Sequence, residues 1–207
     1  MQTTKELPRP ARRKHIHTRK YVAEAYERDD GLFDVEVDMS DVKPYSFDNT
    51  DRDYVAAGEP LHHMKMRVTI NEQMEIVDVE ARTLASPFNI CSDVTPQYKK
   101  LVGVRIAGGF TKQVQEITGR TAGCTHHNDI LKVVGTTAFQ ALWSVLARRR
   151  RERAKIDDLQ DDKTVEKVVG KNPAQALIGT CHAYAPSSSV VKRQWPELHV
   201  PKLRESK

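Results

Sequence analysis

The chain has 207 residues, of which 39% are hydrophobic and 29% charged, and its formal net charge is +5. This length and balance are typical of one soluble globular domain with polar extensions. No apolar run approaches the length of a membrane-spanning helix, and residues 1–20 lack the apolar centre of a secretory signal. Three widely spaced cysteines without such a signal predict reduced thiols and a cytoplasmic protein.

Much of the positive charge lies in two runs, residues 9–20 and residues 148–153. Basic runs bind phosphate backbones in many proteins, but cations also complement the dipole at the end of a helix. Aromatic residues do not alternate with these cations, and four aspartates follow the second run within residues 157–162. We therefore expect no nucleic-acid partner, and the sequence leaves self-association open.

The first half of the chain predicts two hairpins. Residues 1–14 contain Pro8 and Pro10 and predict a disordered basic arm. Residues 15–27 and 32–42 predict the first hairpin, and the second of these strands alternates strictly between apolar and acidic or polar side chains.

After a predicted polar loop at residues 44–60, the second hairpin follows. The apolar face of its first strand is predicted to consist of Met64, Met66, Val68 and Ile70. The apolar face of the returning strand is predicted to consist of Val77, Val79 and Ala81. Four strands with one apolar face each need a covering layer.

The covering layer is predicted to be helical. Its three predicted helices occupy residues 96–102, 110–117 and 128–150, and the last has the clearest apolar stripe. The sequence therefore predicts an α+β domain over residues 15–195. Its antiparallel sheet has four or more strands in two hairpins, covered on one face by two short helices and one long helix.

The C-terminal part is less regular. A loose helix is predicted near residues 164–169, within a highly charged segment. Two closing strands are predicted at residues 176–184 and 190–195, and residues 196–207 predict a mobile tail.

Each of the three cysteines lies near a histidine or a carboxylate, at a break in the hydrophobic pattern. Cys91 is followed by Asp93, Cys124 by His126, and Cys181 by His182. Thiolates, imidazoles and carboxylates bind transition metals, and a thiol beside an imidazole is the minimum for nucleophilic catalysis. The ordinary alternative is a buried thiol that packs as a small hydrophobe.

Cys91 and Cys124 are the two thiols that we expect to meet. Cys124 follows a glycine and precedes the long predicted helix, whose first N–H groups favour a thiolate. Cys91 lies between the fourth predicted strand and the first short helix. Both junctions fall at the same end of the predicted sheet, so the two thiols are expected to converge on one site. His126 or His127 would join Cys124 there.

The remaining histidines are less distinctive. Alternation from Met64 places His62 on the apolar face of its strand, where it is either a packed core residue or part of the site. His15 and His17 lie among basic residues and are predicted to be solvated. The chain has no Cys-x-x-Cys, His-Glu-x-x-His or Gly-x-Ser-x-Gly pattern. The signal is therefore a constellation of residues.

Five ordered segments resemble a known family. They are residues 26–34, Pro60-Leu61-His62-His63-Met64, Pro87-Phe88-Asn89-Ile90-Cys91, Gly123-Cys124-Thr125-His126 and Cys181-His182-Ala183-Tyr184. Over about residues 12–196 the chain resembles a bacterial family of unknown function that is recognised by its Gly-Cys-Thr-His segment. The resemblance names no activity. It implies that His62, Cys91, Cys124, His126 and Cys181 are the characteristic polar positions, while His127 stands where an apolar residue is expected.

The predicted order of elements is also similar to that of the scaffold proteins of iron–sulfur cluster assembly. Those proteins hold a cluster with three cysteines, a histidine and an aspartate, and Cys91, Cys124 and His126 would occupy comparable positions. The third cysteine comes in a different order here, and the N-terminal hairpin is additional. This similarity concerns the fold alone.

Four functional hypotheses follow. The first is a metal-dependent enzyme, a hydrolase or lyase, that acts on a small anionic carboxylate or acyl thioester. Zinc or iron would be held by Cys91, Cys124, His126 and Cys181, and His62 or Asp93 would move the proton. The second is a carrier or scaffold for a metal or an iron–sulfur cluster. The third is metal-free cysteine catalysis by Cys124, and the fourth is nucleic-acid binding.

Overall fold

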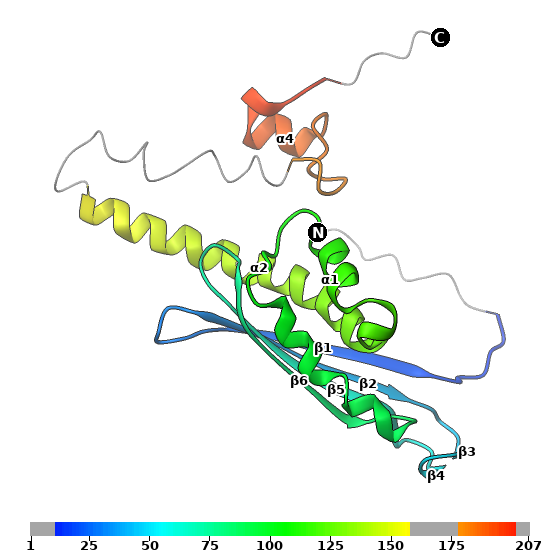
Figure 1. Cartoon of the computed structure of the whole chain (residues 1–207). Coiled ribbons are helices and arrows are strands. Elements are labelled where there is room, and N and C mark those ends of the chain that lie inside the picture. The colour runs from blue at the N-terminus through cyan, green and yellow to red at the C-terminus, as the bar shows by residue number, and fades with distance from the viewer. Residues whose placement is uncertain (1–10, 158–177, 202–207) are drawn as a thin grey trace. The chain divides into compact units, whose positions relative to one another are not determined.

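The computed structural model describes residues 11–157 and 178–201 (Figure 1). The chain divides into two compact units, Met1–Val145 and Leu146–Lys207, which are described separately. Most of the predicted basic arm, the predicted loose helix at 164–169 and the last residues of the predicted tail lie outside the described residues. The prediction of one domain over residues 15–195 stays a prediction.

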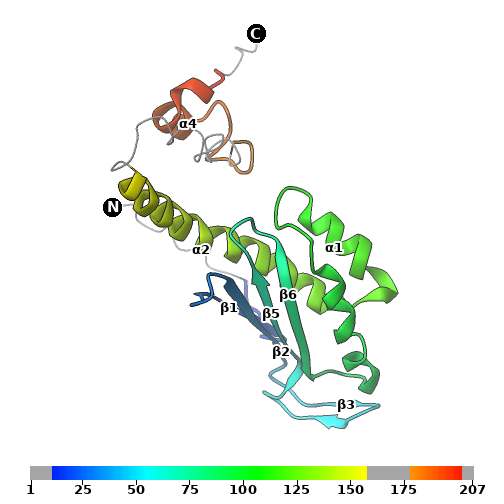
Figure 2. The ribbon, with the colours of Figure 1, turned by 60° about the vertical axis from the view of Figure 1, so that its left-hand side comes forward.

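The first unit is built on a four-stranded antiparallel sheet with the strand order β1-β2-β5-β6 (Figures 1 and 2). The strands are β1 (Thr18–Glu27), β2 (Phe33–Val42), β5 (Pro60–Ile70) and β6 (Ile76–Ala85). The two predicted hairpins are confirmed as β1–β2 and β5–β6, and β2 pairs with β5 to join them.

A second, two-stranded sheet lies within the segment that was predicted to be loop. It consists of β3 (Phe47–Asn49) and β4 (Asp53–Val55), and Phe47 pairs with Val55. The prediction of an irregular segment over residues 44–60 was therefore wrong in part. Strands of three residues are too short to produce a visible alternation of apolar and polar side chains.

The buried face of the main sheet follows the predicted alternation in β2. Phe33, Val35, Val37 and Met39 are at most 2% exposed. In β6 the prediction for Val77 was wrong, because its side chain is 37% exposed while Ile76 is buried. Thr69 pairs with Asp78 and Ile70 pairs with Ile76, so Val77 is an extra residue in a β-bulge. The bulge shifts the inward-facing positions by one.

Helices cover one face of this sheet, as predicted (Figures 1 and 2). They are η1 (Asn89–Ser92), η2 (Thr95–Leu101), α1 (Phe110–Thr118), η3 (Arg120–Ala122) and α2 (Thr125–Asp157). The predicted helix at 96–102 is a 3₁₀ helix, η2, and α2 is longer than predicted at both ends. The predicted apolar stripe of α2 is buried at Leu131, Val134, Ala138 and Leu142.

The second unit contains no strand among its described residues. Residues 178–184 form turns, and the segment predicted as a strand at 190–195 is instead helix α4 (Ser189–Gln194), followed by η5 (Pro196–Leu198). The Ser188 hydroxyl accepts a hydrogen bond from the backbone N–H of Val191 (3.1 Å). This is an N-cap, which favours a helix over an extended strand. Within the described parts of both units, no helix is long and apolar enough to span a membrane.

Candidate metal centre

Asp41 is the centre of a polar cluster on the otherwise apolar face of the sheet. It follows Val37 and Met39 in the alternation of β2, and its side chain is 1% exposed. Arg19 of β1 binds both carboxylate oxygens: its Nε donates to Oδ1 (2.7 Å) and its Nη2 to Oδ2 (2.6 Å). This bidentate, charge-assisted pair fixes the orientation of the carboxylate.

Three histidines approach the same carboxylate. His62 of β5 is paired with Asp41 in the sheet register, and its Nδ1 lies 3.0 Å from Oδ2. Nε2 of His126, in the first turn of α2, lies 3.6 Å from the same oxygen. Nε2 of His17 lies 3.1 Å from Oδ1, and its side chain is 39% exposed, so His17 is solvated as predicted and also contacts Asp41. Two strands, a helix and the segment before β1 therefore meet at Asp41.

The protonation of the cluster follows from burial and from Arg19. Burial opposes the charge of Asp41, but the hydrogen bonds and positive charge of Arg19 outweigh it and lower the pKa of the carboxyl. Burial also lowers the pKa of His62, and repulsion from His126 adds to this effect. For His126, burial and then Arg19 lower the pKa. Both rings are therefore neutral near pH 7, so a ring that donates to Asp41 keeps a lone pair on its other nitrogen.

Cys124 lies directly before α2, where its thiol faces the second nitrogen of His126. The distance from Cys124 Sγ to His126 Nδ1 is 3.9 Å. The Cys124 backbone N–H donates to the Tyr98 hydroxyl (2.8 Å), which lies 3.0 Å from the side-chain oxygen of Asn128. Burial raises the pKa of Tyr98, so this hydroxyl remains protonated and holds the start of the helix in place. The start of a helix favours negative charge.

The residue before Cys124 has to be glycine. A Cβ atom on Gly123 would lie 2.1 Å from the carbonyl oxygen of Thr118, at the end of α1. The close approach of these two backbones brings the start of α2 against α1. The local order Gly-Cys-Thr-His thus has a packing reason as well as a chemical one.

We expect Gly123→Ala to lower the free energy of unfolding by about 2 kcal/mol, because the start of α2 must shift to admit the methyl group. Urea unfolding measures this difference. Gly108→Ala is the matched control, because a Cβ at Gly108 would meet no atom within 4 Å, and its effect should stay within about 0.5 kcal/mol. Equal effects of the two substitutions would contradict the packing argument.

The two predicted thiols line one cleft of about 730 Å³. Cys91 comes from η1 and is half-buried, as is Cys124. The cleft is lined by His62, Met64, Pro87, Phe88, Ile90, Cys91, Asp93, Val94, Gln97 and residues 121–126. Five of the six predicted site residues, namely His62, Cys91, Asp93, Cys124 and His126, therefore share this cleft.

The sixth predicted residue, Cys181, is exposed and belongs to the second unit. Its role as a metal ligand stays a prediction.

His127 is buried and packs against the Tyr98 ring, with ring centroids 5.1 Å apart. Burial lowers the pKa of His127 to about 4, so its ring is neutral. Although it is adjacent to His126 in the chain, it does not line the cleft.

Sequence reasoning missed Asp41 and Arg19. A signal for Asp41 existed: it occupies the next inward position after Phe33, Val35, Val37 and Met39, where a carboxylate is out of place. Arg19 lies among other basic residues, and nothing in its local sequence distinguishes it.

Among the described residues, one group of three side chains has ligand atoms close enough together to hold a metal ion. Ligand atoms of Asp41, His62 and His126 all lie within 4.8 Å of one another. However, both oxygens of Asp41 are already bound by Arg19, and the positive guanidinium would repel a cation at the same carboxylate. The rings of His62 and His126 are also stacked with centroids 3.9 Å apart. Two imidazoles on one tetrahedral zinc have centroids about 5 Å apart, given the usual Zn–N bond length.

The alternative set centres on Cys124 and His126. With the usual Zn–S and Zn–N bond lengths, sulfur and nitrogen ligands of one tetrahedral zinc lie about 3.6 Å apart. The observed separation of Cys124 Sγ and His126 Nδ1, 3.9 Å, is close to this value. In this arrangement Asp41 orients His126 through the opposite ring nitrogen, which is how carboxylates commonly support metal-binding histidines.

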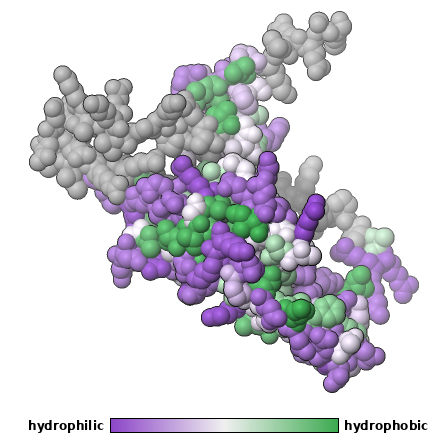
Figure 3. Space-filling model, in the orientation of Figure 1, coloured by the Kyte–Doolittle hydropathy of each residue, from purple (hydrophilic) through white to green (hydrophobic). Residues whose placement is uncertain are grey.

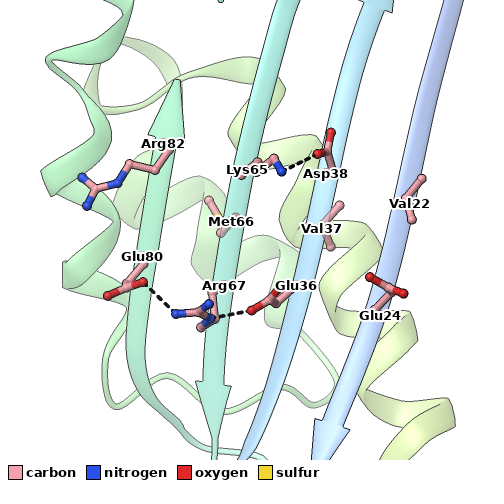
Figure 4. Close-up of a pocket in the computed structure, with 10 residues that line it drawn as sticks. All are labelled: Val22, Glu24, Glu36, Val37, Asp38, Lys65, Met66, Arg67, Glu80 and Arg82. Atoms are coloured by element: carbon pink, nitrogen blue, oxygen red, sulfur yellow. Dashed lines mark hydrogen bonds and ion pairs between the residues drawn. The ribbon is translucent and has the colours of Figure 1, made fainter. Parts of the chain in front are cut away.

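A second hollow lies on the opposite, open face of the sheet (Figure 4). Arg67 is placed between Glu36 (2.7 Å) and Glu80 (3.2 Å), and Lys65 pairs with Asp38 (3.0 Å). These cross-strand pairs are typical of a solvated sheet face. The residues of the described part of the chain that line this hollow include no cysteine and no histidine, in contrast to those of the cleft.

Comparison with known proteins places the chain in a family. Residues 17–140, more than half of the chain, match the family described as "Protein of unknown function (DUF2889)", and the chain belongs to this family. The match covers the whole main sheet and the start of α2, including Asp41, His62, Cys91, Cys124 and His126. No curated protein and no solved structure was found to match.

Proposed function

We propose that the chain is a metal-dependent enzyme whose metal ion, zinc or iron, is bound by Cys91, Cys124 and His126. The observation that carries the proposal is the line of contacts from Cys124 Sγ to His126 Nδ1 (3.9 Å) and from His126 Nε2 to Asp41 (3.6 Å). Cys91 lines the same cleft, and the short helix η1, in which no residue is buried, would have to bring its thiol closer to the other two ligands.

The chemistry of this donor set supports a catalytic site. Two thiolates and one imidazole are soft and borderline ligands that suit zinc or iron. Catalytic zinc sites keep three protein ligands and leave the fourth position for water or substrate. The Gly-Cys-Thr-His segment supplies two of the three ligands and, through Gly123, the close approach to the backbone of Thr118 that positions them. A reducing cytoplasm would keep both thiols available.

His62 is proposed to move the proton. Its Nδ1 faces Asp41 and its ring is neutral near pH 7, so Nε2 keeps a lone pair. A bound metal ion would supply a water of lowered pKa or a polarised carbonyl. His62 would accept the proton, and Asp93 lines the same cleft as a second candidate. A hydrolase or lyase acting on a carboxylate or an acyl thioester fits these roles.

A carrier or scaffold for a metal or an iron–sulfur cluster is the second candidate. The supporting observation is that Cys91 lies on a short 3₁₀ helix in which no residue is buried, so a ligand could be delivered or removed there. The resemblance to scaffold proteins of cluster assembly points in the same direction. This candidate uses the same ligands without turnover.

Metal analysis of protein purified without air tests these proposals. We expect about one zinc or mononuclear iron per chain and no acid-labile sulfide. Stoichiometric sulfide with visible absorption would favour the scaffold. Absence of metal, together with rapid alkylation of Cys124, would replace both proposals with metal-free cysteine catalysis.

A further inference from the structure

Large apolar side chains at the cleft have no role in the proposed proton and metal chemistry. Phe88 and Ile90 both line the cleft and are 52% and 73% exposed. Pro87 and Val94 add further apolar surface to the same lining. On the face shown in Figure 3, hydrophobic residues form separate patches on a largely hydrophilic surface. Exposed apolar side chains grouped at a cleft are typical of a site that is covered by an apolar ligand.

The charges around the cleft do not favour an anion. The described residues that line it include neither lysine nor arginine. Asp93 contributes a carboxylate to the lining. Arg19 lies close to the cleft, but its Nε and Nη2 groups already donate to the two oxygens of Asp41 and are not available to an anion. A negatively charged group in this cleft would thus meet a like charge without a compensating cation.

We propose that the cleft binds an uncharged, apolar acyl chain of the substrate, seated against Phe88 and Ile90. This inference rests on the proposed function, which places the reactive carbonyl of the substrate near Cys124 and His126. It narrows the predicted small anionic carboxylate or acyl-thioester substrate to an acyl compound whose chain is apolar. The cleft volume of about 730 Å³ suits a chain of moderate length.

A series of N-alkylmaleimides with increasing chain length tests the inference on the full-length protein in the presence of a chelator. A thiolate adds to the maleimide double bond, and peptide mass spectrometry gives a separate rate for each cysteine. We expect the rate at Cys124 to rise about two- to fourfold for each added methylene. The exposed Cys181 in the same molecule is the internal reference and should show a flat series.

Ile90→Ser should reduce the dependence on chain length at Cys124 and leave the rate with N-methylmaleimide within about twofold. A maleimide that carries a carboxylate should react more slowly at Cys124 than at Cys181. Equal chain-length dependence at both cysteines, faster reaction with the anionic reagent, or no labelling of Cys124 by any reagent would overturn the inference. Metal content is measured separately, so failure of the proposed function would not be mistaken for failure of the apolar site.

Discussion

Replacing Cys124 by alanine should abolish metal binding, from about one metal ion per chain to less than about a tenth. The substitution removes one of only three proposed protein ligands, and the thiolate contributes both charge and the softness that zinc prefers. The loss should occur without unfolding, because Cys124 is held through its backbone N–H to Tyr98 (2.8 Å), which alanine keeps. Elemental analysis and circular dichroism of the same sample measure both outcomes.

Cys181→Ala distinguishes the ligand set predicted from the sequence, which includes Cys181, from the proposed set of Cys91, Cys124 and His126. The sequence predicted Cys181 as a ligand, and its exposed side chain belongs to the second unit. We expect this variant to keep its full metal content. Loss of metal in Cys181→Ala would restore the predicted ligand set, and full occupancy in Cys124→Ala would remove Cys124 from the site.

Replacing Asp41 by asparagine should lower the free energy of unfolding by about 3 kcal/mol. Asp41 is 1% exposed and accepts both hydrogen bonds from Arg19, so the amide leaves a partly buried guanidinium without its charged partner. The substitution should also weaken zinc binding about 10- to 100-fold, because Asp41 orients His126. Urea unfolding and a competitive zinc titration measure the two effects.

Asp129→Asn is the matched control for Asp41→Asn. Asp129 lies 3.7 Å from the same guanidinium, but its side chain is 30% exposed. A solvent-accessible ion pair contributes at most about 1 kcal/mol, and we expect a small change in stability and unchanged zinc affinity. If both substitutions lowered stability equally, the burial of Asp41 would not be the reason for its importance.

Much of the fold could be predicted from local pattern. The strict alternation of apolar and polar residues in β2 is typical of a strand. The spacing of Leu131, Val134 and Ala138 is typical of a helix with one buried face. The errors arose where a period is interrupted or too short. The bulge at Val77 changes the inward-facing positions, β3 and β4 have three residues each, and the Ser188 cap converts a strand-like segment into α4.

The candidate site could be predicted in part. Thiols and imidazoles at element junctions are visible in the sequence, and five of the six predicted residues line one cleft. The charges that orient them are not visible there, because Arg19 and Asp41 are 22 positions apart and meet only through the pairing of β1 with β2. The resemblance to a family of unknown function agreed with the family match over residues 17–140.

The antiparallel sheet, its helical cover and the residues able to carry chemistry could be predicted from the sequence, because side-chain periodicity and reactivity are local properties. The meeting of Asp41, His62 and His126 beside Cys124 is visible only in the folded chain. Strand register and the packing of α2 bring these groups together. Arg19 then keeps the buried Asp41 carboxylate charged, and burial favours the neutral form of the two imidazoles.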